Sequence, residues 1–268
     1  MTFQPIVPLT GYVGWRFLER TIENQQSAYA ESQPIARATT YFRENIGQVQ
    51  TAEDLVNDRQ LLSVALGAFG LDDDIDNKFF IQRILEDGTI DDDALANRLT
   101  DTRYSDLSRS FGFGDGVLPR TALGSFPQEI IERFEARQFE RAIGEQDNDL
   151  RLALNVSTGV SDIVAQNSTT NARWFSIMGN APLRSVFQTA LGLPSSIASI
   201  DIDQQLEIFQ ERSASVFGTD EIADFNEPEK QEELIRLFLV RSEAASFSAA
   251  SAGSTALTLL QSVPNLYA

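Results

Sequence analysis

The stretch LLSVALGAFGL, residues Leu61–Leu71, is the clearest indication of a helical fold. From Ala65 onward it is apolar apart from its glycines, and its leucine and valine residues form a face that a helix would pack inward. Gly70 lies where a residue in the left-handed conformation commonly ends a helix. We therefore predict a buried helix that stops at this glycine.

A second stretch, LRSVFQTALGL at residues Leu183–Leu193, matches the first with a constant offset of 122 residues. Six of the eleven positions are identical, including the glycine before the last leucine. Ile75 also falls on Ile197 at this offset, and beyond them the match fades. Because the offset is close to half of the chain, the pattern predicts an old duplication of a helical unit. A chance match between two segments of similar composition is the alternative.

Helical periodicity also marks other segments. One apolar stripe, preceded by Ser32 and Pro34, falls at Ile35, Ala38, Phe42, Ile46 and Val49. Residues Thr51–Asp54 have the form of a capping box, with Asp in place of the usual Glu. The acidic run Asp91–Asp93, followed by Ala94, Leu95 and Leu99, predicts a helix with an acidic first turn. Alternating strand-like runs bounded by Asn-Gly or Asp-Gly are missing, so we predict a mainly α fold of two related helical units.

Glycine and proline mark the expected boundary between the units. Phe111–Pro119 concentrates glycine and ends in proline, and Gly124–Pro127 adds a second break. We predict a first helical unit over residues 1–118, a second over 119–243 and a small-residue tail over 244–268. The tail has a low-complexity composition, which is compatible both with a loosely ordered end and with a functional segment.

The composition removes whole classes of chemistry. The chain has 268 residues and neither cysteine nor histidine. It therefore has no disulfide framework, thiolate nucleophile or imidazole base, and none of the Cys and His ligands of zinc and iron sites. The net charge is −18, and 19 of the 21 basic residues are arginines. A pI near 4.3 disfavours contact with phosphate backbones and anionic lipid, so we expect no nucleic-acid binding.

No targeting or membrane-spanning segment is predicted. Met1–Trp15 contains no Lys or Arg, whereas a secretory signal begins with positive charge. The longest charge-free stretch, Ala244–Ala268, includes seven Ser or Thr residues. We expect the chain to be cytoplasmic as synthesised, without membrane insertion, and export by a dedicated apparatus stays open.

Two motifs resemble ligand sites but lack diagnostic residues. An EF-hand loop beginning at Asp72 would need Gly and Glu where the chain has Asn77 and Arg83. The glycine run Gly112–Gly116 lacks the Gly-Lys-Ser/Thr of a phosphate loop and is interpreted as a linker. We expect no metal, no cofactor and no catalytic residue. Paired carboxylates are the one acid/base chemistry left open.

Five short motifs form a further pattern: YFRENI (41–46), DLVND (54–58), LGAFGL (66–71), ANRLTDTRY (96–104) and FGF (111–113). Together they resemble an alphaproteobacterial family catalogued as domain of unknown function 1217, over roughly residues 15 to 240. The resemblance implies a predominantly helical protein. It also implies a role in flagellar assembly or structure, because the genes of this family often lie among flagellar genes. No catalytic residues are assigned in that family, so none are carried over.

The most acidic part of the chain overlaps these motifs. Between Gly70 and Asp106, 11 acidic residues oppose four basic ones. Such a surface can steer a basic partner, although a solvated face is the commoner case. The candidate interaction surface consists of Asp72, Asp73, Asp74, Asp76, Asn97, Arg98, Asp101, Arg103 and Tyr104.

Three functional hypotheses follow. The leading one is a non-enzymatic protein that acts through protein–protein contacts in flagellum assembly, located in the flagellum or its export apparatus. The alternative is an acidic small-ligand-binding module, or a carboxylate-based enzyme. An export chaperone is the third, although such chaperones are usually much smaller than this chain.

Overall fold

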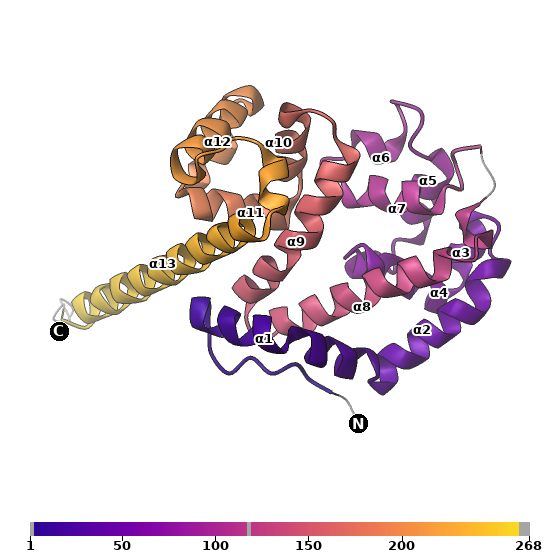
Figure 1. Cartoon of the computed structure of the whole chain (residues 1–268), viewed down its shortest axis with the longest axis horizontal. Helices are drawn as coiled ribbons and strands as arrows, with labels where there is room; N and C mark the ends of the chain where they lie inside the picture. The colour runs from indigo at the N-terminus through magenta and orange to yellow at the C-terminus, as the bar shows by residue number, and fades with distance from the viewer. Residues whose placement is uncertain (1–2, 117–118, 263–268) are drawn as a thin grey trace, which may run out of the picture.

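The computed structural model describes the backbone of residues 3–116 and 119–262 and, within these ranges, the side chains of all but residues 248–262. This part of the chain forms thirteen α-helices and five short 3-10 helices, with no strand (Figure 1). The prediction of a mainly α fold is confirmed. The helices are α1 (Gly11–Ala30), α2 (Gln33–Asn45), η1 (Ile46–Gln48), α3 (Ala52–Asn57), α4 (Arg59–Ala68), η2 (Asp72–Asp74), α5 (Lys78–Asp87), α6 (Leu95–Arg98), α7 (Arg103–Phe111), η3 (Arg120–Ala122), α8 (Phe126–Gly144), α9 (Asn148–Gln166), α10 (Thr170–Gly179), α11 (Ala181–Leu191), η4 (Ser195–Ser199), α12 (Ile202–Phe217), η5 (Ile222–Asn226) and α13 (Pro228–Ser262).

The first of two hydrophobic cores forms around α4. All of its residues from Leu61 to Ala68 are buried except Ser63. Helices α2 and α3 and the first half of α8 pack directly on α4, and α5 and α7 contribute further buried residues to this core. Gly67 allows the close approach of α4 and α8, because a Cβ there would lie 2.8 Å from the Phe134 ring. The predicted helix is thus buried, as its pattern indicates.

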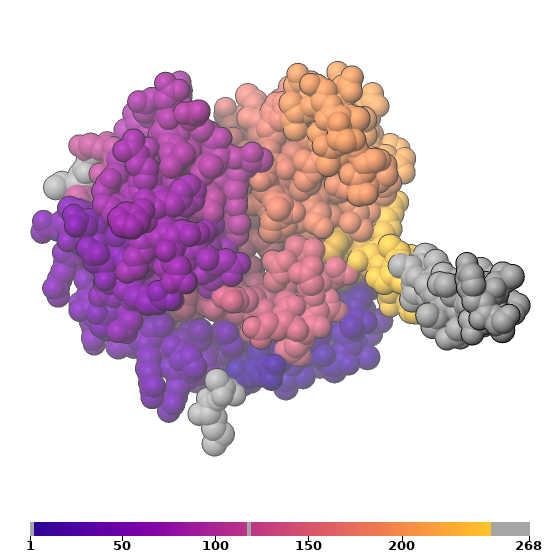
Figure 2. Space-filling view, turned by 180° about the vertical axis from the view of Figure 1, so that it is seen from behind, coloured from indigo at the N-terminus to yellow at the C-terminus, as the bar shows by residue number. Residues whose placement is uncertain are grey.

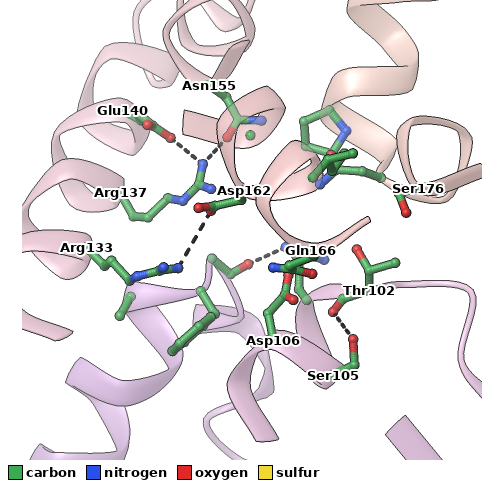
Figure 3. A pocket seen from close by; sticks show the side chains of 18 of the residues that line it. Thr102, Ser105, Asp106, Arg133, Arg137, Glu140, Asn155, Asp162, Gln166 and Ser176 are labelled. Atoms are coloured by element: carbon green, nitrogen blue, oxygen red, sulfur yellow. Dashed lines mark hydrogen bonds and ion pairs between the residues drawn. The ribbon is translucent and has the colours of Figure 1, made fainter. Parts of the chain in front are cut away.

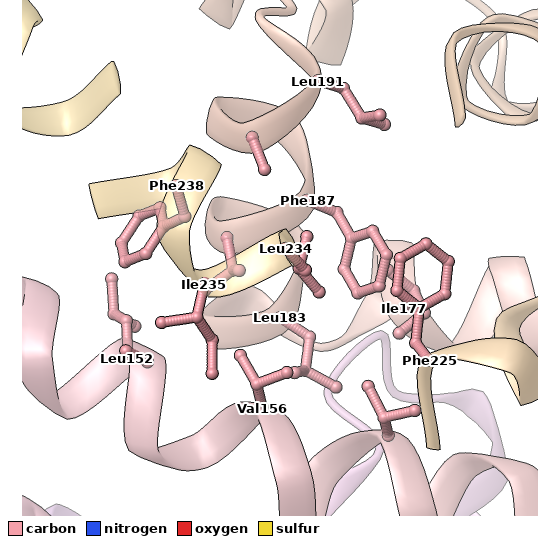
Figure 4. Packing of buried hydrophobic residues seen from close by; sticks show 14 of the residues in the cluster. Leu152, Val156, Ile177, Leu183, Phe187, Leu191, Phe225, Leu234, Ile235 and Phe238 are labelled. Atoms are coloured by element: carbon pink, nitrogen blue, oxygen red, sulfur yellow. The ribbon is translucent and has the colours of Figure 1, made fainter. Parts of the chain in front are cut away.

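The second core forms around α11. Leu183 of α11 lies next to Val156 of α9 and below Leu234 of α13, and Phe187 of α11 packs against Phe225 (Figure 4). Leu191, at the end of α11, belongs to the same core. Helices α1, α10 and α12 and the second half of α8 complete this core.

Helix α8 belongs to both cores. Its first half contributes Ile130 and Phe134 to the first core, and its second half contributes Phe139 and Ile143 to the second. The change from one core to the other therefore falls inside a single helix. The predicted boundary lies earlier, at residues 118 and 119, and the division into those units stays a prediction.

Helix α1 is separated in sequence from the core that it joins. Its Trp15 and Leu18 belong to the second core. Glu232 of α13 holds the helix in place, since it accepts a 2.6 Å hydrogen bond from the Tyr12 hydroxyl and a 3.2 Å bond from the Trp15 indole nitrogen. The N-terminal helix and the last helix thus pack together (Figure 1).

The two matching sequence stretches adopt the same local structure. Asp58 and Asn180, which are also 122 residues apart, cap the N-termini of α4 and α11 with their side chains. Gly70 and Gly192 follow the C-termini at φ of +69° and +68°. After each glycine a leucine N–H donates to the carbonyl five residues earlier, at 2.9 Å in both places. Helices α4 and α11 therefore have the same kinds of cap at both ends. A common origin of the two units stays a prediction.

The structure bears on several local expectations, and two of them are wrong. The stripe Ile35–Val49 is not one helix, because α2 ends at Asn45 and a 3-10 turn follows. The helix expected after Asp91–Asp93 is a single turn, α6, whose first turn contains no acidic residue. The capping box at Thr51–Asp54 is confirmed. Within the tail expected over 244–268, α13 continues as one helix to Ser262 and extends away from the body (Figure 1), and residues 263–268 lie outside the described part.

The glycine run Gly112–Gly116 is held against the first unit. Asp115 accepts a 2.7 Å hydrogen bond from the Thr89 backbone N–H. Gly114 packs so closely on Gly88 that a Cβ would lie 2.3 Å from the Gly88 nitrogen. These contacts tie the segment to the loop after α5.

Of the helices described, none combines the length and the apolar character needed to cross a membrane.

Candidate functional site

The predicted interaction residues divide between exposed positions and a set of internal contacts. Asp73, Asp76, Asn97 and Arg98 are exposed, whereas the others are partly buried. Asp76 pairs with Arg59 at 2.7 Å on the surface. The Asn97 amide donates to the carbonyls of Thr89 and Asp91 at 2.9 and 2.8 Å, so this side chain holds the loop before α6.

Arg103 joins three parts of the first unit. It forms an ion pair of 2.6 Å with Asp101 and donates a further hydrogen bond to the Gly70 carbonyl. Burial alone would raise the pKa of Asp101, but its hydrogen bonds and charge contact with Arg103 hold that pKa below its ordinary value. The guanidinium therefore reinforces the C-terminal cap of α4.

Tyr104 lies beside Arg103 and contacts the acidic turn η2. Its hydroxyl donates a 2.7 Å hydrogen bond to Asp74 Oδ2. Burial and this contact raise the pKa of Tyr104 to about 12. Part of the predicted surface is therefore a structural connection between η2 and α7.

A pocket of about 480 Å³ lies between helices of the two cores. Its walls are α7, the end of α4 and η2 on the side of the first core, α9 and α10 on the side of the second, and the shared helix α8. The space-filling view shows a notch between the magenta and the orange lobes (Figure 2). A volume of this size is in the range of small-molecule sites. Of the predicted residues, Asp72, Asp73 and Arg103 line it, and the other six do not.

Charged side chains dominate the pocket (Figure 3). Six arginines line it, which are Arg103, Arg109, Arg133, Arg137, Arg141 and Arg151. Five carboxylates accompany them, which are Asp72, Asp73, Asp106, Glu140 and Asp162. The lining thus carries a small positive excess in a chain whose net charge is −18.

The interface of α8 and α9 holds the most buried part of this network. Glu140 is 8% exposed and pairs with Arg137 at 2.8 Å, and Arg137 also donates to the Asn155 amide oxygen (Figure 3). Burial raises the pKa of Glu140 despite its arginine partner. The Arg151 guanidinium donates to the Asn148 amide oxygen at 3.1 and 2.8 Å. Burial lowers the pKa of Arg151, and the charges of Arg137 and Arg103 add to this effect, whereas the charge of Glu140 opposes it.

The end of α8 leaves room for Arg151. A Cβ at Gly144 would lie 2.4 Å from Arg151 Cδ. The absence of a side chain at Gly144 therefore lets the arginine stem cross the end of the helix.

Asp106 contributes an unsatisfied carboxylate oxygen on the opposite side of the pocket. Its Oδ1 is buried and has no hydrogen-bond partner. Arg109 Nη1 lies 3.6 Å away, which is longer than a hydrogen bond. Burial raises the pKa of Asp106. An unsatisfied buried carboxylate is costly, and such groups are common in functional sites.

The arginines of α8 and α9 were not among the predicted site residues. No motif joins them, because the packing of two helices brings them together. The sequence contains far more arginine than lysine, but this composition does not indicate which arginines lie together in the folded chain. No set of three or more carboxylates placed to hold a metal ion occurs among the described residues.

Comparisons with known proteins match this architecture. A family model described as "Protein of unknown function (DUF1217)" matches residues 68–231, which include all of the residues that line the pocket. The chain is also similar to a protein of Agrobacterium tumefaciens whose crystal structure was determined by a structural genomics consortium. The two share 26% identity with a TM-score of 0.72, over 90% of this chain and 98% of the other. No curated protein matches the sequence.

Proposed function

Because the chain belongs to the DUF1217 family, for which no function is established, we propose a function from its own surface. The protein acts without catalysis, through protein–protein contacts, in the assembly or structure of the bacterial flagellum. The flagellar context comes from the gene neighbourhood that the family resemblance implies. The contact function is supported by the surface of the first unit.

The observation that carries the proposal is two apolar side chains exposed within the acidic segment. Phe79 is 89% exposed and Ile90 is 74% exposed. They lie near opposite ends of α5, between the acidic groups Asp72–Asp76 and Asp91–Asp93. An aromatic anchor within a charged rim is typical of protein interfaces. The partner expected here has an apolar pocket with basic residues around it.

Replacing Phe79 tests this surface. A strain without the gene would be complemented with the native chain, with Phe79→Ser or with Ile202→Ser. Ile202 is a suitable control because it is 46% exposed on α12, in the other unit. We expect the native chain and the control to restore filaments and swimming, and Phe79→Ser to fail while it accumulates normally. Normal filaments and swimming in the deletion strain would contradict the flagellar role.

The partner is identified by a pull-down with the same three chains. Cell-body and flagellar fractions would be analysed separately by mass spectrometry. A flagellar protein captured by the native chain and the control, but not by Phe79→Ser, is the expected result. Equal capture by all three chains would contradict this surface.

Small-ligand binding is the second candidate, and the pocket between the two cores favours it. The pocket is lined by six arginines, and the buried Asp106 Oδ1 at its wall has no hydrogen-bond partner.

A further inference from the structure

We propose that the α8–α9 side of the pocket binds a small phosphate-bearing molecule, held by Arg103, Arg137 and Arg151. This site is independent of the protein contacts proposed above. Its evidence is the charge balance around Glu140, the placement of the three arginines on three helices and the polar lining around them.

The buried network is short of negative charge. Arg137 pairs with the buried carboxylate Glu140, whose charge also acts on Arg151, and the other partners of these two arginines are the neutral amides Asn155 and Asn148. Arg103 adds a third guanidinium to the lining, and it is already paired with Asp101, which lies outside the lining. Because Arg137 and Arg151 share one carboxylate, a bound anion would balance the positive charge on this side of the pocket.

The arrangement favours phosphate over carboxylate. The three arginines come from three different helices, α7, α8 and α9, which form separate walls of the pocket. A tetrahedral phosphate offers oxygens in several directions, whereas a planar carboxylate offers two. Arginine also binds such oxygens in a bidentate manner.

The pocket is larger than a bare phosphate, and the remaining lining is polar. Ser105, Gln166, Asn167 and Asn180 supply hydroxyl and amide groups around the volume of about 480 Å³. Such groups suit the hydroxyls of a phosphorylated polyol or sugar. We therefore expect a phosphate monoester with a polar body to bind more tightly than inorganic phosphate.

Two substitutions with opposite expected effects test the site. Isothermal titration calorimetry would use the full chain with inorganic phosphate, glycerol 3-phosphate and citrate. For the native chain we expect glycerol 3-phosphate to bind with a Kd below about 1 mM. Arg151→Gln should weaken binding at least tenfold. Glu140→Gln should tighten it severalfold, because it removes the competing carboxylate and keeps the size of the side chain.

Arg59→Gln is the control, since Arg59 is exposed and pairs with Asp76 away from the pocket. It should bind as the native chain does. No saturable binding of any phosphate by the native chain would overturn the proposal, as would equal affinities of the native chain and a folded Arg151→Gln variant. If that variant does not fold, unchanged or weaker binding by Glu140→Gln would overturn it instead. Tighter binding of citrate than of both phosphates would overturn the assignment to phosphate.

Discussion

The hydroxyl of Tyr104, at the start of α7, donates a 2.7 Å hydrogen bond to Asp74 Oδ2 at the end of η2, 30 residues earlier in the chain. Arg103 contacts the Gly70 carbonyl just before η2. Two adjacent side chains of α7 thus hold the segment that follows the central helix of the first core. These contacts give the ANRLTDTRY motif a structural role.

Removing the Tyr104 hydroxyl should weaken this connection. Tyr104→Phe is expected to lower the free energy of unfolding by about 1 kcal/mol, since one hydrogen bond is lost. The pKa of Tyr104 is about 12 in the folded chain, against an ordinary value of 10.0. A raised pKa means that this contribution is complete below pH 10 and is lost as the pH rises toward 12. Denaturant titrations at pH 8 and above pH 11 would measure it, and an equal difference between the two chains at both pH values would contradict the assignment.

The glycines that end α4 and α11 should differ in their tolerance of alanine. Both have φ near +70°, so a side chain costs roughly 1 kcal/mol in backbone strain at either position. A Cβ at Gly70 would meet Arg103 Nη1 at 3.6 Å, an ordinary contact, whereas at Gly192 it would meet Arg241 Nη1 at 3.0 Å. Arg241 also donates to the Ala190 carbonyl and so resists displacement. Thermal melting should show Gly192→Ala to be the more destabilised variant, and the reverse order would be evidence against this geometry.

Asp106→Asn should stabilise the protein at neutral pH. The amide has a similar shape but removes the buried charge whose Oδ1 has no partner, a gain of about 1 kcal/mol. Burial raises the pKa of Asp106, so the folded chain binds this proton more readily than the unfolded chain. The cost of the native carboxylate therefore disappears as the pH falls, and the advantage of the variant should shrink toward pH 4. Denaturant titrations across this range would show it, and a constant advantage would contradict a protonation effect.

Truncation after Ser246 should leave both cores folded. The last buried side chain described in α13 is Leu239, and Phe247 is 70% exposed. The shortened chain should melt within a few degrees of the full one. Truncation after Glu233 is the contrasting variant, because it removes Leu234, Ile235, Phe238 and Leu239 from the second core. We expect the chain truncated after Glu233 to lose cooperative folding. Equal stability of the two truncated chains would show that α13 is not needed in this core.

Local signals in the sequence predicted much of the fold. The apolar run before Gly70 and its counterpart before Gly192 predict two buried helices with glycine caps, because a left-handed residue has few alternatives to glycine. The capping box at Thr51 depends on residues three positions apart. Such features are short-range, so one sequence is enough to find them.

The features that could not be predicted from the sequence depend on contacts between distant residues or on weak local preferences. Leu95–Arg98 is a single turn, and the backbone is already extended at Leu99. The segment after Ser246 is rich in alanine and serine, and this composition indicates a low-complexity tail. Alanine also strongly favours a helix, and α13 continues through this segment to Ser262. The pocket arginines come together only when α7, α8 and α9 pack, so no spacing in the sequence predicts their meeting.

Helix α1 has a mechanical consequence. It packs with the core that also contains the last helix, so the first core is inserted into the sequence of the second. Force applied at either terminus would then reach the second core first and remove α1 or α13 from it. In a protein drawn end-first through a narrow channel, this core would yield before the first, whichever end entered.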